Sequence, residues 1–68
     1  MTRLRINGVE QEVAAATVAE LLADRGVGPQ QRFVAVAVNG AVVRRAAWHE
    51  TALGPGDLVE IVRPLQGG

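Results

Sequence analysis

The chain opens with two short runs in which polar and apolar residues alternate, Thr2–Ile6 and Val9–Val13. Alternation with a period of two is typical of a strand that has one buried face. Asn7 and Gly8 separate the runs, and both accept the positive φ that a two-residue type I′ turn requires. The pattern therefore predicts an antiparallel hairpin.

A two-residue turn also fixes which side chains face one another. One face carries opposite charges and the other is mainly apolar. The predicted pairs are Arg5 with Glu10, Arg3 with Glu12, Ile6 with Val9 and Leu4 with Gln11. Each cross-strand pair contributes roughly 0.2–1 kcal/mol. We expect the charged pairs to lie outside, and Ile6 and Val9 to lie inside.

Residues 17–25 have the pattern of a short amphipathic helix. Thr17 and Glu20 have the spacing of a capping box, Arg25 suits the negative end of the helix dipole, and Gly26 suits the position after it. The apolar stripe consists of Val18, Leu21 and Leu22.

The rest of the chain predicts three more strands. Residues 33–38 are apolar on both faces, which favours a central place in the sheet. An Asn39-Gly40 turn leads to a strand over 41–44. Residues 46–50 are too short for an independent helix and predict a turn or 3₁₀ segment with Trp48 against the core. The last elements are a tight turn over 53–57 and a strand over 58–63 that turns Val59 and Ile61 inward.

This order of elements indicates an α+β domain, because one helix covers only one face of a sheet. It matches the ubiquitin-like β-grasp, a mixed five-stranded sheet in which the first and last strands lie parallel at the centre and the main helix packs on one face. We expect the domain to comprise residues 1–63, followed by a flexible C-terminal tail over 64–68.

Composition narrows the function. The 68 residues include no cysteine and no lysine, and seven arginines balance seven acidic residues. A neutral chain without basic clusters and with few aromatic residues is a poor candidate for nucleic acid or anionic membranes. We expect a cytoplasmic protein that is a monomer when free. Without lysine the chain cannot accept an isopeptide bond on a side chain.

The sequence shows no self-contained active site. His49 is the only histidine, the acidic residues lack metal-loop spacing, and no helix with Lys-Ser/Thr follows Gly54-Pro55-Gly56 as a phosphate loop requires. We predict no catalytic residue, no metal and no cofactor bound by the chain itself.

The final residues, Gly67 and Gly68, carry the strongest functional signal. Residues without a Cβ can enter a narrow channel and let another backbone approach closely. The reactive group that they present is an α-carboxylate, which suits chemistry performed by a partner enzyme.

The whole chain resembles the ThiS family of sulfur carriers. The matching segments are Val38-Asn39-Gly40 with Val43-Arg44-Arg45 and Trp48, Gly54-Pro55-Gly56-Asp57, Val59 to Pro64, and Gln66-Gly67-Gly68. One departure is Arg44-Arg45-Ala46-Ala47, where the family pattern leads us to expect a proline-containing segment.

The resemblance implies a protein co-substrate rather than an enzyme. A ThiF-like adenylyltransferase would use ATP and magnesium to activate the carboxylate of Gly68. Sulfur from a cysteine desulfurase would give a thiocarboxylate, and thiazole synthase (ThiG) would take that sulfur for thiamine. Gly67 and the stalk formed by Pro64, Leu65 and Gln66 would enter the partner's active site.

The open sheet face should dock the partners. The candidate docking residues are Phe33, Ala35, Ala37, Leu58, Val62 and Arg63.

Three other functions stay open. They are the small subunit of molybdopterin synthase, a ubiquitin-like protein modifier, and a β-grasp binding module with an inert tail.

Overall fold

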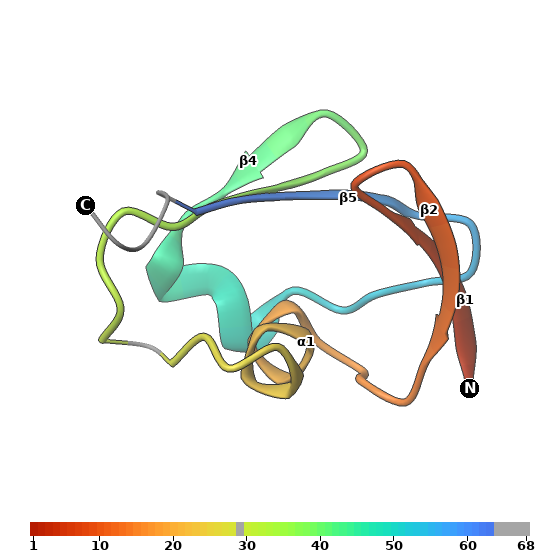
Figure 1. Ribbon diagram of the computed structural model, residues 1–68, viewed down its shortest axis with the longest axis horizontal. Helices are drawn as coiled ribbons and strands as arrows, with labels where there is room; N and C mark the ends of the chain where they lie inside the picture. The colour runs from red at the N-terminus through yellow and green to blue at the C-terminus, as the bar shows by residue number, and fades with distance from the viewer. Residues whose placement is uncertain (29, 64–68) are drawn as a thin grey trace.

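The computed structural model describes residues 1–28 and 30–63, and these form a five-stranded mixed sheet with a helix across one face (Figure 1). The elements are β1 (Thr2–Ile6), β2 (Val9–Val13), α1 (Val18–Asp24), β3 (Ala35–Val38), β4 (Ala41–Val43), the 3₁₀ helix η1 (Arg45–Glu50) and β5 (Leu58–Val62). The strand order is β2-β1-β5-β3-β4. β1 and β5 are parallel, and the other neighbours are antiparallel. The expected α+β arrangement is confirmed.

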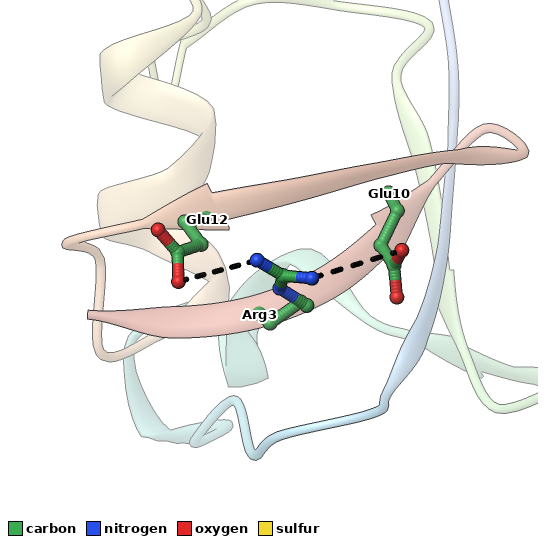
Figure 2. Close-up of polar contacts among 3 residues, drawn as sticks. All are labelled: Arg3, Glu10 and Glu12. Carbon is green, nitrogen blue, oxygen red and sulfur yellow. Dashed lines mark ion pairs between the residues drawn. The ribbon is translucent and has the colours of Figure 1, made fainter.

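The predicted register of the first hairpin is confirmed at all four pairs. The ion pairs differ from the expectation, because Arg3 lies between both acidic residues of β2 (Figure 2). Its guanidinium is 3.6 Å from the Glu12 carboxylate and 4.0 Å from that of Glu10. The prediction that Val9 lies inside is wrong. Its side chain is 57% exposed, since it lies at the turn end of an edge strand.

The helix begins as its capping residues predict. The Thr17 hydroxyl accepts a hydrogen bond from the Glu20 N–H at 3.2 Å, and the Glu20 carboxylate accepts one from the Ala16 N–H at 2.8 Å. The second bond goes to the residue before the N-cap rather than to the N-cap itself. At the other end, Arg25 is the C-cap and Gly26 has a φ of 80°, a conformation that glycine adopts without strain.

The third strand departs from the strand-pattern prediction in both its start and its place, whereas the β-grasp prediction that the first and last strands lie parallel at the centre is confirmed. β3 starts at Ala35, because Phe33 has a φ of 60° and cannot continue an extended strand. The central strand is β5, which pairs with β1 on one side and β3 on the other. β4 and β5 each end one residue earlier than expected, at Val43 and Val62.

The core lies between the sheet and the layer formed by α1 and η1. Trp48 from η1 is 4% exposed and donates its indole N–H to the Val43 carbonyl at 3.1 Å, which confirms the predicted 3₁₀ segment. The other buried residues are Leu4, Ile6, Ala15, Val18, Leu21, Leu22, Val27, Val36, Leu53 and Val59. Within the described ranges no helix has the length and apolar character needed to cross a membrane.

Candidate docking surface and C-terminal stem

The predicted reactive end lies outside the described residues. This applies to Gly68 and Gly67, and to the stalk formed by Pro64, Leu65 and Gln66. The structure does describe the last strand before them. We call Ile61, Val62 and Arg63 the stem, because every residue of the predicted tail follows it.

The side of the sheet facing away from α1 carries an apolar patch. Residues in β5 alternate in burial, so Val59 and Ile61 face the core while Leu58 and Val62 face outward. The register between β3 and β5 places Ala35 opposite Val62. We call the outward-facing group formed by Ala35, Ala37, Val42, Leu58 and Val62 the outer patch; Ala37 is half-buried and the other four are exposed.

Four of the six predicted docking residues belong to this patch. Val42 was not predicted, although it is 75% exposed. The hairpin register could have indicated it, because Val42 lies opposite Ala37. Ala35, Ala37, Val42 and Val62 also line a shallow hollow, together with Val36 and the polar residues Asn7 and Glu60. The patch is therefore an apolar surface over β3, β4 and β5 that is interrupted by Glu60, which faces outward between Leu58 and Val62 and lies opposite Ala37.

The other two predicted residues lie beside the patch. Phe33 belongs to the loop before β3, where its side chain is 78% exposed. A bulky residue with positive φ is uncommon and costs backbone energy. Arg63 follows the alternation of β5 to the core side, and its guanidinium donates to the Arg25 carbonyl at 3.4 Å. A cation at the C-terminal end of a helix is stabilised by the helix dipole.

Two asparagines hold the backbone of β5, a role that sequence reasoning missed. The Asn7 amide accepts a hydrogen bond from the Ile61 N–H at 2.8 Å and donates to the Ile61 carbonyl at 3.2 Å. The Asn39 amide accepts from the Leu58 N–H at 2.9 Å and donates to the Asp57 carboxylate at 3.1 Å. Their Asn-Gly pairs indicated hairpin turns, but no local pattern shows these distant contacts.

The remaining polar residues do not form a catalytic cluster in the described part of the chain. His49 is exposed and lies 3.6 Å from the Glu50 carboxylate. No group of three side chains suited to a metal ion occurs in residues 1–28 and 30–63. The Gly54 N–H donates to the Asp57 carboxylate at 2.8 Å, so this donor is used within its own turn.

The parallel pairing of β1 with β5 and the helix across one face define a ubiquitin-like β-grasp domain. The family profile described as the ThiS family matches residues 4–68, and the chain belongs to this family.

Two solved structures agree with the family match. The crystal structure of the thiamine biosynthesis protein (ThiS) from Geobacter metallireducens is 36% identical, with a TM-score of 0.77. The match covers 98% of this chain and 100% of that one. A solution NMR structure of a thiamine biosynthesis protein from the same organism is also 36% identical, with a TM-score of 0.78 and coverage of 98% and 88%. The comparison with curated proteins gives no match.

Proposed function

We propose that this chain is a sulfur carrier in thiamine biosynthesis and that Gly68 carries the sulfur as a thiocarboxylate. The observation that carries the proposal is the ThiS family match, which extends from β1 through Gly68. The fold supports it, because the central strand β5 leads directly to the residues of the predicted reactive end.

The chemistry needs activation by a partner. A carboxylate is a poor electrophile because its negative charge is shared by two oxygens. A ThiF-like adenylyltransferase with ATP and magnesium joins AMP to the Gly68 carboxylate and releases pyrophosphate. The terminal sulfur of a desulfurase-derived persulfide then attacks the acyl-adenylate carbonyl and displaces AMP to give an acyl disulfide. A second thiol reduces this disulfide, which releases the Gly68 thiocarboxylate and leaves a disulfide between the two thiols. The thiocarboxylate is the covalent carrier, and thiazole synthase (ThiG) is its acceptor.

The carrier chain supplies shape rather than catalytic groups in this scheme. Gly67 and Gly68 have no side chain, so they fit where another backbone must approach closely. Pro64 stiffens the start of the stalk because its ring fixes φ. Leu65 and Gln66 complete the length that reaches the partner's active site. ATP and magnesium belong to the partner.

The outer patch is the proposed docking surface for the adenylyltransferase and, in turn, for thiazole synthase. Exposed apolar patches on small domains mark interaction sites, and this one includes Val62 of the stem. A partner that covers the patch is therefore held next to the point where the reactive end leaves the sheet. Phe33, in the loop before β3, and Arg63, the last residue of the stem, are the further proposed contacts beside the patch.

Reconstitution with partner enzymes tests the proposal. The chain is incubated with its adenylyltransferase, ATP, magnesium, a desulfurase and cysteine, and is then given to thiazole synthase or to the large subunit of molybdopterin synthase. We expect thiazole to form with thiazole synthase. We expect no sulfur transfer with the large subunit of molybdopterin synthase. Sulfur transfer only to the molybdopterin enzyme, or attachment of the chain to lysines of other proteins, would contradict the assignment to thiamine.

A further inference from the structure

We propose that Asn7 is a positioning residue for the reactive end, because its side-chain amide fixes the direction in which the stem leaves the sheet. The inference rests on the proposed function, since it concerns how Gly68 is presented to the adenylyltransferase. The contact joins the first hairpin turn to a residue 54 positions later in the chain.

The amide continues the ladder between β1 and β5 after β1 has ended. Along this parallel pair the Arg5 N–H donates to the Asp57 carbonyl at 3.0 Å, and the Asn7 N–H donates to the Val59 carbonyl at 2.9 Å. The next step of a parallel ladder involves Ile61. Asn7 has a φ of 50° and turns into the hairpin, so its side chain takes the place of the backbone and bonds both polar groups of Ile61.

This contact adds hydrogen bonds to the stem on the side of β1, in addition to those that β3 makes on the other side. The β1–β5 strand pairing ends at Val59, whereas β3 continues to pair with β5 as far as Val62. In the described ranges, the Asn7 amide provides the hydrogen bonds that link the stem to the hairpin of β1 and β2. Loss of the amide would leave the stem bonded to β3 and, through the Arg63 guanidinium, to the Arg25 carbonyl, with no hydrogen bond to the hairpin to fix its exit angle on that side.

Asn39 provides a matched control in the same chain. It also precedes a glycine in a hairpin turn, with a φ of 53°, and its amide also makes two hydrogen bonds next to β5. Those bonds lie at Asp57 and Leu58, where the strand begins. Removal of this amide should therefore loosen the opposite end of β5 and leave the stem in place.

The variants Asn7→Gly and Asn39→Gly remove each amide while keeping the positive φ that the turns require. Adenylation of the carrier by the ThiF-like adenylyltransferase is measured with ATP and magnesium as pyrophosphate release, while the concentration of carrier is varied. For Asn7→Gly we expect kcat to fall about fivefold and KM to stay within about twofold, because orientation of the reacting group acts mainly on the chemical step. Asn39→Gly should keep both constants within about twofold of the wild type.

Two further measurements separate positioning from loss of structure. Amide hydrogen exchange of Ile61 should accelerate in Asn7→Gly and stay unchanged in Asn39→Gly, because local opening sets the exchange rate. Asn7→Asp keeps an acceptor for the Ile61 N–H but places a carboxylate oxygen against the Ile61 carbonyl oxygen, so its kcat should fall at least as far as that of Asn7→Gly.

The outcomes distinguish this proposal from the function on which it rests. Equal kinetic effects of the two glycine variants, or a change in KM alone, would overturn the positioning role while leaving the carrier function intact. A wild-type chain that its active adenylyltransferase does not modify would overturn the carrier function, and the positioning role with it. A slower kcat confined to Asn7→Gly, with faster exchange at Ile61, supports the proposal.

Discussion

Replacing Val62 by alanine should weaken binding of this chain to its ThiF-like adenylyltransferase about fivefold without unfolding the domain. The substitution removes two carbon atoms from the outer patch next to the stem. Val62 is 64% exposed in the free chain, so about two thirds of its side chain is available for burial by a partner. At about 0.8 kcal/mol per buried CH₂ group, the loss is roughly 1 kcal/mol, which corresponds to about a fivefold increase in Kd.

Val9→Ala is the matched control. Val9 is 57% exposed, but it lies at the turn end of the edge strand β2 and outside the outer patch. Binding of both variants is measured by isothermal titration calorimetry, and their stability by urea denaturation. Both should unfold within about 0.5 kcal/mol of the wild type, as surface substitutions usually do. Wild-type affinity of Val62→Ala, or an equal loss in Val9→Ala, would refute the assignment of the docking surface.

Three further predictions concern the reactive end, the core and the helix. Deletion of Gly67 and Gly68 should abolish thiocarboxylate formation, while the circular dichroism spectrum and urea midpoint stay those of the full chain; sulfur loading of the truncated chain would count against the carrier mechanism. Trp48→Phe should lower the free energy of unfolding by about 2–3 kcal/mol, because it leaves a cavity and removes the donor to the Val43 carbonyl; a change below about 0.5 kcal/mol in urea denaturation would contradict this packing. Thr17→Ala should lower the free energy of unfolding by about 1 kcal/mol through loss of the N-cap hydrogen bond to the Glu20 N–H. Thr17→Ser keeps the hydroxyl and should retain most of that stability. Equal losses in the two variants would argue against the cap.

Local patterns predicted the elements whose contacts are close in sequence. The Asn7-Gly8 turn fixes the register of the first hairpin, because a two-residue loop leaves one pairing. Thr17 and Glu20 mark the start of α1 for a similar reason, since their hydrogen bonds span three or four residues. These signals depend on backbone conformation within a single turn.

The errors concern contacts between distant segments and one local backbone conformation. Apolar periodicity placed β3 at the centre, whereas the order of elements, matched to the β-grasp, placed β1 and β5 there, and the structure confirms the second prediction. The start of β3 is a local error, because nothing in the residue pattern indicated the positive φ of Phe33 that shortens the strand. The roles of Asn7 and Asn39 were missed because their side chains bond residues 54 and 18 or 19 positions away.

In the candidate site, too, local strand patterns predicted some residues, and pairing between strands was needed to find others. The outward alternation of Leu58 and Val62 was predictable from the strand period, and the structure confirms that both are exposed. Val42 joins them through the pairing of β4 with β3. Arg63 is two residues after Ile61, so the strand alternation turns it to the same side of the sheet. Its hydrogen bond to the Arg25 carbonyl agrees with this placement on the core side. The reactive role of Gly68 stays a prediction.

The measurement that tests the central claim most directly is the intact mass of the chain after incubation with its ThiF-like adenylyltransferase, ATP, magnesium, a cysteine desulfurase and cysteine. The account predicts a mass increase equal to the exchange of one oxygen for one sulfur, and fragmentation should place it on Gly68. An unchanged mass, in the presence of an adenylyltransferase that loads a known ThiS protein, would contradict the account.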